Sequence, residues 1–409
     1  MNILIAPDSF KESLEAIEVC EAIKAGFSNV FPEAAYTLLP LADGGEGTSA
    51  VLSYVLDGQW RQIQVHDPLM RPITSKYFLT ADGIAVIEIA EACGLHLLTK
   101  DERNPLIASS FGVGEMIVDA IDQGATNILI GLGGSATNDA GAGMLQALGV
   151  KLQDAKGTAL KPGGSNLIQL HSIEHQALYN LLSDVTITVA CDVTSPLCGP
   201  TGASHVFGPQ KGATPEQVQS LDNALGIFAQ VTNAHNISKT DCREFEGAGA
   251  AGGLGFGLMA YCNAKLKSGF DTIADIVELD KHLALADMVI TGEGMFDAQT
   301  AMGKVASGVA KCAKQHNVPV IAICGAVDRP NELSAATTND IKSASIDESP
   351  LLTSLQFETD LFDIVVPSLQ KLDSLEQVFA NANRNVAHTA YQIATALKLG
   401  KNIAAIKSR

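Results

Sequence analysis

Acidic side chains follow several predicted strands, each inside a glycine-rich or hydroxyl-rich loop. Four of them are Asp8, Asp43, Asp192 and Glu293. In a mostly parallel sheet, ligands bind beyond the carboxyl ends of the strands, so these loops are expected to gather at such an edge. Carboxylates there can hold Mg²⁺, and one of them can accept the proton of an attacking hydroxyl group. With glycine loops and selected lysines, this set of groups matches what phosphoryl transfer requires.

The segment 128–139 carries the clearest signal for anion binding. A short apolar run at 128–130 predicts a buried strand, and the glycines after it let the backbone approach a ligand closely. The polar residues that follow are good N-caps for a helix, whose first N–H groups suit a phosphate or a carboxylate. A tight strand-to-helix turn without a ligand is the alternative interpretation. The candidate phosphate or substrate contacts are Gly133, Gly134, Ser135, Thr137 and Asn138.

Positive charge is scarce in this chain of 409 residues. The 27 Lys and Arg residues stand against 45 Asp and Glu residues, which gives a formal net charge of −18. This balance argues against a nucleic-acid or acidic-lipid binder, so an anionic substrate needs local cations. The motif lysines Lys11, Lys211 and Lys304 are the candidates. Lys11 lies in the first turn of a predicted helix, where it opposes the helix dipole; it is either a solvated lysine or an anion contact.

Two acids three residues apart, Asp43 and Glu46, enclose a pair of glycines after a predicted strand. Such a loop can place two carboxylates near one cation, although an Asx turn with a capping glutamate would use the same residues. We therefore regard Asp43, Glu46 and Glu293 as metal or nucleotide-shell candidates. Asp192 or Asp297 is the candidate general base, because each lies in a loop after a predicted strand.

The run 247–253 satisfies the formula G-x-G-x-x-G of dinucleotide-binding loops. No buried strand precedes it, as that motif would require. A glycine-rich helix N-terminus that stabilises developing anionic charge is the better interpretation, with Gly249 and Gly252 as candidate contacts.

Several protein classes are excluded by what the sequence lacks. It has no G-x-x-x-x-G-K-[ST] loop, no H-R-D catalytic loop and no G-x-S-x-G elbow. The eight cysteines form no C-x-x-C pair, which favours free thiols over a zinc site. No signal peptide or membrane-spanning stretch is visible, and we expect a cytoplasmic protein that binds neither membranes nor nucleic acids.

The elements that must position these residues alternate along the chain. Apolar strand patterns near 3–6, 36–41, 85–90, 128–132, 185–190, 286–291 and 319–323 alternate with amphipathic helical patterns. Residues 59–80 show the alternation of an antiparallel hairpin, 199–212 a long irregular loop, and 375–399 a closing helix. This order predicts an α/β fold with a mostly parallel sheet and helices on both faces.

Seven motifs in a fixed order are similar to those of the type I glycerate kinase family. They are A6-PDSFKESL-14, A42-DGGEGT-48, G131-LGGSATND-139, A190-CDV-193, F207-GPQKG-212, G247-AGAAGG-253 and T291-GEG-294. The resemblance runs from Met1 to about Ile323 and resumes in the last helix. It implies ATP-dependent phosphorylation of D-glycerate, with Mg²⁺ as cofactor and 2-phosphoglycerate as the expected product.

The resemblance also implies an architecture and extends the set of site residues. It implies a flavodoxin-like, doubly wound parallel sheet and a second, inserted α/β domain with a mixed sheet, with the active site in the cleft between them. We expect the first domain at 1–56, 106–150 and 283–409, the second at 57–105 and 151–282, and a monomer or homodimer. Asp8 and Lys11 join the catalytic candidates. Glycerate's carboxylate needs a cation, for which Arg71 is a candidate with a surface role as the alternative.

The chain departs from the family pattern at two positions. Met295 stands where the family usually has Arg, and Ala306 where it usually has Pro. Loss of the Arg would weaken nucleotide or substrate binding if that residue contacts a phosphate, and would cost little if it forms a surface ion pair. The stretch 326–360 is longer than usual and is predicted to be a surface insertion. An NAD-dependent oxidoreductase of a small hydroxy acid and a non-catalytic ligand-binding protein remain the alternatives.

Overall fold

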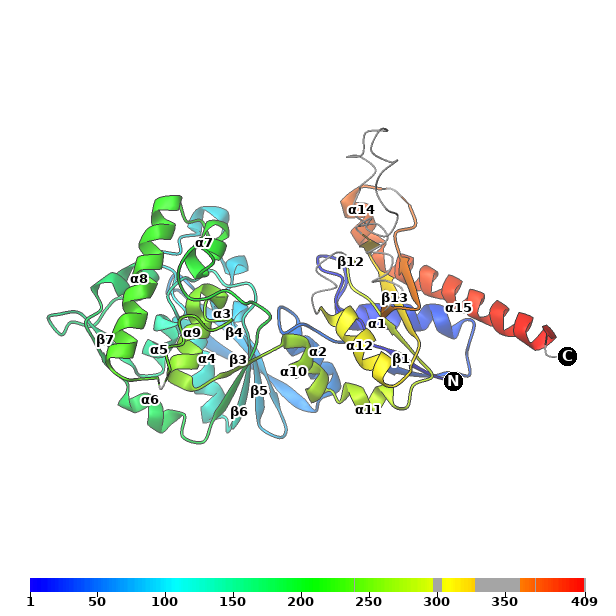
Figure 1. Ribbon diagram of the computed structural model, residues 1–409, viewed down its shortest axis with the longest axis horizontal. Helices are drawn as coiled ribbons and strands as arrows, with labels where there is room; N and C mark the ends of the chain where they lie inside the picture. Colours follow the sequence, from blue (N-terminus) through cyan, green and yellow to red (C-terminus); the bar gives the residue numbers. More distant parts are fainter. Residues whose placement is uncertain (239, 297–303, 328–360, 372, 408–409) are drawn as a thin grey trace, which may run out of the picture. The chain divides into compact units, whose positions relative to one another are not determined.

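The computed structural model describes residues 1–409 except 239, 297–303, 328–360, 372 and 408–409 (Figure 1). The chain divides into two compact units, which are described separately. Unit 1 contains residues 1–42 and 273–409, and unit 2 contains residues 43–272. Both are α/β units, as the alternation of strand and helix patterns predicts.

Unit 1 is built on a five-stranded, fully parallel sheet of order β15-β13-β11-β1-β2. Its strands are β1 (Asn2–Ile5), β2 (Ala35–Leu38), β11 (Met288–Thr291), β13 (Val320–Cys324) and β15 (Ile364–Pro367). Numbered within the unit, this order is 2-1-3-4-5, which is the flavodoxin-like order. The central strands are buried, apolar runs, as expected for a sheet that is covered on both faces.

Helices α1 (Ala16–Ser28) and α15 (Ala382–Lys407) lie side by side in unit 1 (Figure 1). Their apolar faces form one core with the sheet, to which Phe27 and Val386 contribute fully buried side chains. The remaining elements of the unit are α11 (Leu279–Leu283), α12 (Val305–Gln315), α14 (Leu375–Ala380) and the short pair β12 (Met295–Phe296) and β14 (Ala326–Val327). α10 (Gly269–Ile276) crosses the boundary between the units.

Unit 2 is built on a six-stranded mixed sheet of order β10-β9-β6-β5-β4-β3. Its strands are β3 (Gly58–His66), β4 (Pro72–Thr80), β5 (Ile84–Glu88), β6 (Asn127–Gly131), β9 (Thr186–Ala190) and β10 (Lys265–Lys267). β10, β9, β6 and β5 run parallel, and the predicted hairpin β3–β4 continues the sheet in antiparallel pairing. A small antiparallel pair joins β7 (Lys151–Gln153) to β8 (Ser172–Glu174).

The helices of unit 2 other than α2 contribute buried side chains to a second core, and α2 packs on β4 and β5. They are α2 (Thr48–Val55), α3 (Ala90–Cys93), α4 (Phe111–Asp122), α5 (Ala142–Ala147), α6 (Gln176–Leu181), α7 (Ala203–Phe207), α8 (Pro215–Ala234) and α9 (Ala250–Cys262). Four 3₁₀ turns complete the unit: η1 (Leu95–Leu97), η2 (Lys100–Glu102), η3 (Gly164–Gln169) and η4 (Pro209–Lys211). Among the described residues, no helix is both long and apolar enough to cross a membrane.

The structure divides the chain differently from the domain boundaries expected from the sequence. Residues 106–150, expected in the domain of the first strand, belong to unit 2, because β6 pairs with β5 and β9. Residues 43–56 also belong to unit 2. Sequence patterns identify β6 as a buried strand but cannot specify its neighbours, since pairing partners are set by tertiary contacts.

Two segments are more regular, or less regular, than predicted. The expected loop 199–212 contains the helical turns α7 and η4, which are too short to show a helical period. The closing helix is interrupted at Asn381, between α14 and α15. The expected surface insertion at 326–360 lies outside the described residues, apart from Ala326 and Val327 in β14.

Gly26 allows α1 to approach α15, and its replacement provides a test of the unit 1 core. A Cβ atom at Gly26 would overlap the carbonyl oxygen of Ala387 and lie 2.7 Å from the Ala390 Cβ atom. Alanine normally favours a helix over glycine by about 1 kcal/mol. We expect the collision to reverse the sign, so that Gly26→Ala lowers the free energy of unfolding by about 1–3 kcal/mol in urea denaturation.

Gly400 in α15 is the matched control, because a Cβ atom there has no neighbour within 4 Å. Gly400→Ala is expected to leave stability unchanged or raise it by up to about 1 kcal/mol. Equal effects of the two substitutions would contradict the close approach of α1 and α15.

Candidate active site

In unit 2 the glycine loop after β6 is held in place by main-chain pairing. The N–H of Ala136 donates to the carbonyl of Cys93, and the N–H of Leu95 donates to the carbonyl of Gly134, both at 2.8 Å. Gly133 and Gly134 remain the more exposed part of the loop, whereas the side chains after Ser135 are buried. The loop therefore presents its glycine backbone to solvent and anchors its polar side chains inside the unit.

Asp139 anchors the far end of this loop. Its carboxylate accepts hydrogen bonds from the N–H and the hydroxyl group of Ser110, both at 2.9 Å, and from the N–H groups of Gly141 and Gly143 at 3.2 Å. The side chain is fully buried, and burial raises the pKa of the Asp139 carboxyl group. Four donors compensate for that burial, which makes Asp139 a structural anchor at the starts of α4 and α5.

The acidic loop that begins at Asp43 packs directly against the glycine loop. A Cβ atom at Gly131 would lie 2.6 Å from the carbonyl oxygen of Gly44, and one at Gly133 would lie 3.3 Å from the Gly45 Cα atom. A side chain at Gly131 would therefore force the two loops apart. The half-buried carboxylate of Asp43 accepts the N–H of Gly45 at 3.0 Å, which fixes it at this contact.

Asp192 lies after β9, on the neighbouring strand of the same sheet. Its carboxylate accepts the N–H of Gly269 at 3.1 Å. Although Asp192 as a whole is an exposed residue, desolvation of its carboxyl group, together with the negative charges of Asp43 and Asp271, raises the pKa of that group above its ordinary value. A carboxylate so placed holds a proton more readily, which suits a group that must accept one from a hydroxyl.

Glu88, at the end of β5, was not among the sequence candidates. Its carboxylate accepts the N–H groups of Gly47 at 3.1 Å and Ser49 at 2.7 Å, so it caps the start of α2 and fixes the loop that carries Asp43 and Glu46. An acid at the end of a predicted strand was the available signal, but nothing in the sequence links Glu88 to residues about 40 positions away.

Lys211 is buried inside unit 2, although it was predicted to contact an anion. Only 2% of the residue is exposed. Its ammonium group donates to the Ser135 hydroxyl at 2.9 Å and to the Thr137 carbonyl at 2.6 Å. Burial lowers the pKa of Lys211 to about 8. Asn138 is held from the same side, because its amide donates to the hydroxyl of Ser204 at 2.9 Å.

In the run 247–253, the space beside Gly249 and Gly252 is filled by protein backbone. A Cβ atom at Gly249 would overlap the carbonyl oxygen of Pro196, and one at Gly252 would overlap that of Thr137. The start of α9 is not a regular helix terminus, because Ala251, Gly252 and Gly253 are left-handed, with φ of 52°, 70° and 89°. These features correct the predicted helix N-terminus: the two glycines permit close packing against 137–140 and 196.

Arg71, predicted to bind a substrate carboxylate, is held by two acids of the protein. Its guanidinium group donates to Asp67 at 2.5 Å and to Glu102 at 2.7 Å. Asp67 is buried and also accepts the N–H groups of Leu69 and Arg71, so the arginine closes a turn between β3 and β4. This arrangement matches the surface role that the sequence left open as the alternative.

Unit 1 gathers a second group of the predicted residues. β1 and β11 are adjacent, and the N–H of Asp8 donates to the carbonyl of Gly292 at 2.9 Å. A Cβ atom at Gly294 would lie 3.3 Å from the backbone nitrogen of Lys11, so the loops after the two strands touch. Lys304 lies 3.6 Å from the buried carboxylate of Glu293. Asp8, Lys11, Glu293 and Lys304 thus lie together at the carboxyl ends of the strands.

The remaining sequence candidates are placed as follows. Asp297 lies outside the described residues. Met295 is exposed and Ala306 is buried in the first turn of α12. Within the described part of the chain, no group of three or more His, Cys, Asp or Glu side chains could hold a metal ion by itself. Of the three metal candidates, Asp43 and Glu46 belong to unit 2 and Glu293 to unit 1.

Comparisons with known proteins agree with one another. The model of the glycerate kinase family matches residues 3–354. Glycerate kinase of Bacillus subtilis is 46% identical over 404 residues, covering 98% of this chain and 99% of the relative. Glycerate 2-kinase of Escherichia coli K12 is 42% identical, with 98% and 99% coverage. A crystal structure from Salmonella typhimurium LT2, provisionally described as glycerate kinase 2, matches with a TM-score of 0.84, 43% identity and coverage of 98% and 99%.

These matches extend over nearly the whole chain, and their sequence identity of 42–46% far exceeds what a shared fold alone would produce. The chain is an enzyme that belongs to the glycerate kinase family.

Proposed function

We propose that this enzyme transfers the γ-phosphoryl group of ATP to D-glycerate, with Mg²⁺, and that 2-phosphoglycerate is the product. Family membership supports the reaction class, and the relative named glycerate 2-kinase supports the position of transfer. The observation that carries the proposal is the direct contact between the acidic loop at Asp43 and the glycine loop at Gly131–Gly134. Phosphoryl transfer needs a metal-holding carboxylate beside a phosphate-binding backbone, and this contact provides that neighbourhood.

The glycine loop is proposed to bind the phosphates of ATP. The backbone at Gly133 and Gly134 is the accessible part, and the side chains of Ser135, Thr137 and Asn138 are fixed behind it. Asn138 Oδ1 is buried and has no hydrogen-bond partner among the described residues. In unit 1, Lys11 and Lys304 are proposed to contact phosphate oxygens, with Asp8 in the same cluster.

The donors of unit 2 fit Mg²⁺. Burial and the negative charge of Asp43 raise the pKa of Asp192, so at least two carboxylates lie close together there. Hard carboxylate oxygens are the ligands that Mg²⁺ prefers, and the ion typically takes only one or two of them from the protein, the rest coming from phosphates and water. Asp43 and Glu46 would hold the ion in unit 2, where it would neutralise phosphate charge when bound, and Glu293 stays a metal candidate of unit 1.

Asp192 is proposed to accept the proton of the glycerate hydroxyl group as it attacks the γ-phosphorus. The raised pKa of Asp192 and its position after β9 support this role. Asp297 remains the second candidate for the same role.

The basic test is a coupled assay for ADP with ATP, Mg²⁺ and D-glycerate, followed by ³¹P NMR of the product. ADP release that requires all three components, with the phosphoryl group on the C2 oxygen, is expected. Phosphorylation at C3 would overturn the position of transfer, and NADH formation from NAD⁺ and glycerate without ADP release would overturn the reaction itself. Chelation of Mg²⁺ by EDTA is expected to abolish turnover, and excess Mg²⁺ to restore it.

Asp192→Asn is expected to lower kcat by about 10²- to 10⁴-fold, since it removes the proton acceptor without changing the size of the side chain. Asp184→Asn is the control, because Asp184 is an exposed acid just before the same strand, at its opposite end. If the Asp192 variant keeps kcat within threefold of the control, and Asp297→Asn shows the loss instead, the base is Asp297.

For the glycerate carboxylate we propose Arg103 in place of Arg71. Arg103 forms no ion pair among the described residues, and its Nε atom is buried without a hydrogen-bond partner there. Its backbone packs on Gly212, next to Lys211 and hence near the glycine loop. A half-buried guanidinium group with an unsatisfied donor, in a chain of net charge −18, suits an anionic ligand.

Arg103→Met is expected to raise KM for D-glycerate by about 10- to 100-fold, as loss of a charge-assisted hydrogen bond predicts, with KM for ATP within threefold. Arg71→Met is the matched comparison: it should lower the melting temperature, because buried Asp67 loses its partner, but leave KM for glycerate within about threefold. A larger KM effect at Arg71 than at Arg103 would reverse the assignment.

A further inference from the structure

Lys211 reaches the glycine loop from behind, through the interior of unit 2. It ends η4, and its two hydrogen bonds span Ser135 and Thr137, which lie 76 and 74 residues earlier in the chain. Side-chain burial leaves 2% of the residue exposed. A lysine that binds the phosphates of a diffusing nucleotide must offer its ammonium group to solvent when the ligand is absent, and Lys211 does not.

The segment that carries Lys211 holds the loop at a second point. Ser204, in α7, accepts a hydrogen bond from the amide of Asn138 at 2.9 Å, so residues 204 and 211 together hold the loop at positions 135, 137 and 138. The turn between them is tightly packed: a Cβ atom at Gly208 would overlap the carbonyl oxygen of Ser204. This packing sets the position of Lys211 within the fold.

The chemistry of the contact determines what Ser135 can still do. The ammonium group is a donor only, so it occupies a lone pair of the Ser135 oxygen and leaves the hydroxyl hydrogen to donate elsewhere. No other hydrogen bond of the Ser135 side chain occurs among the described residues. Lys211 therefore holds Ser135 so that the O–H of the serine is free to donate a hydrogen bond to a phosphate oxygen.

We propose that Lys211 is a positioning residue, which holds Ser135 and Thr137 of the glycine loop in their binding geometry and does not itself contact ATP or glycerate. The assignment of the loop to phosphate binding rests on the proposed function; the internal role of Lys211 rests on its burial and contacts alone. The phosphate-binding role of the loop and the internal role of Lys211 are therefore tested by separate experiments.

The charged groups around Lys211 are Asp139 in the loop and the thiol of Cys93 in α3. The oxygens of Asp139 accept the donors at Ser110, Gly141 and Gly143, and the hydrogen bonds of Lys211 go to Ser135 and Thr137 instead. Burial outweighs both neighbours and lowers the pKa of Lys211 to about 8. Below that pH the bonds to Ser135 and Thr137 are charge-assisted, and above it they are weaker neutral bonds.

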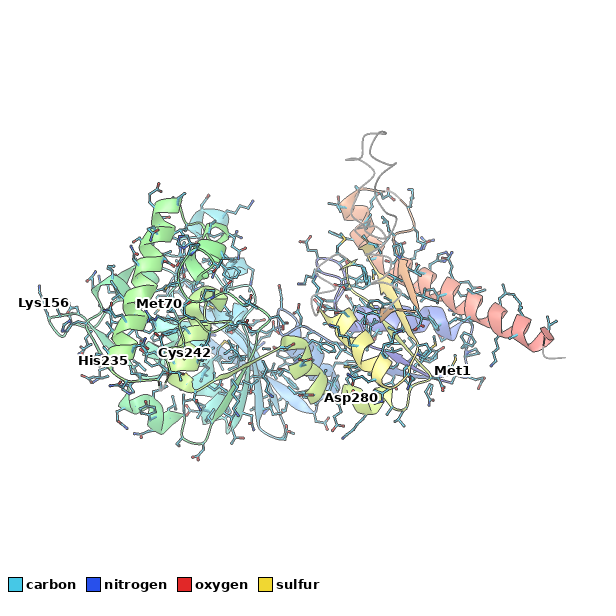
Figure 2. All side chains as sticks on the ribbon, viewed as in Figure 1. Met1, Met70, Lys156, His235, Cys242 and Asp280 are labelled. Atoms are coloured by element: carbon cyan, nitrogen blue, oxygen red, sulfur yellow. The ribbon has the colours of Figure 1, made fainter. Side chains whose placement is uncertain are left out.

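The first experiment needs no variant and no activity. The wild-type protein without ligand is treated with acetic anhydride at pH 8, and the labelling of each lysine is followed by mass spectrometry. Lys156 is the reference, because it is exposed at the tip of the loop after β7 (Figure 2). Lys211 is expected to react at least 100-fold more slowly than Lys156, with no change on addition of ATP. Labelling at a similar rate, or protection by ATP, would overturn the proposal.

The second experiment uses Lys211→Met, which keeps the length of the side chain and removes the donor. Amide hydrogen exchange at 133–139 in the ligand-free protein is expected to become at least tenfold faster, while that of the β3–β4 hairpin stays unchanged. A phosphate contact would leave exchange of the free protein unaltered. Lys156→Met is the control and should change neither exchange nor kcat.

Kinetics separate positioning from direct contact. Lys211→Met is expected to lower kcat on the order of 10- to 100-fold with KM for ATP within about threefold. The double variant with Ser135→Ala should be only slightly worse than Lys211→Met, because both changes remove one shared contact. Independent effects that multiply, or a rise in KM for ATP with normal kcat, would show that Lys211 binds the nucleotide.

The pH profile provides the last readout. Wild-type kcat is expected to decline as pH rises through about 8, since Lys211 loses its charge there, and Lys211→Met should lack this limb. Profiles of identical shape would contradict the role of the charge. If the enzyme lacks the proposed activity altogether, the labelling and exchange experiments still decide the assignment of Lys211.

Discussion

The proposed site depends on one steric constraint: two backbone segments of unit 2 touch where neither carries a side chain. Gly131 and Gly133 face Gly44 and Gly45, and a single methyl group at Gly131 would lie 2.6 Å from a carbonyl oxygen. This contact sets the separation between the carboxylate of Asp43 and the loop assigned to phosphate. It also explains why glycine is required at Gly131, whereas Gly44 is required by its positive φ and by the Ala190 Cβ atom, which a Cβ atom there would overlap.

A half-buried carboxylate and a buried ammonium group hold the two loops in place in the absence of ligand. Glu88 fixes the acidic loop through two N–H groups, and Lys211 fixes the glycine loop through two acceptors. Desolvating a carboxylate or an ammonium group is costly, and the hydrogen bonds that compensate must be well aligned. That cost is tolerated because a preorganised site needs less rearrangement when charge moves during phosphoryl transfer.

Local signals predicted the elements but not the contacts between them. Apolar runs with glycine or acid at their ends identified β1, β6, β9 and β11, because strand composition and turn chemistry are local properties. The same logic could not reveal the partners of Lys211, which lie more than 70 residues away, or the acid partner of Arg71, Glu102, which lies 31 residues away. Glycine in 247–253 is ambiguous in sequence, since close packing and ligand binding both require the absence of a Cβ atom.

The positions of the two buried charges near the glycine loop follow from their hydrogen bonds to the protein. Lys211 and Asp139 are both buried near the glycine loop, yet their hydrogen bonds run in different directions. Asp139 accepts hydrogen bonds from donors at the starts of α4 and α5, whereas the ammonium group of Lys211 donates to the loop itself. In a low-dielectric interior a charge acts beyond its own contacts. A chain of net charge −18 can therefore favour an anion at this loop although the lysine beneath it never meets solvent.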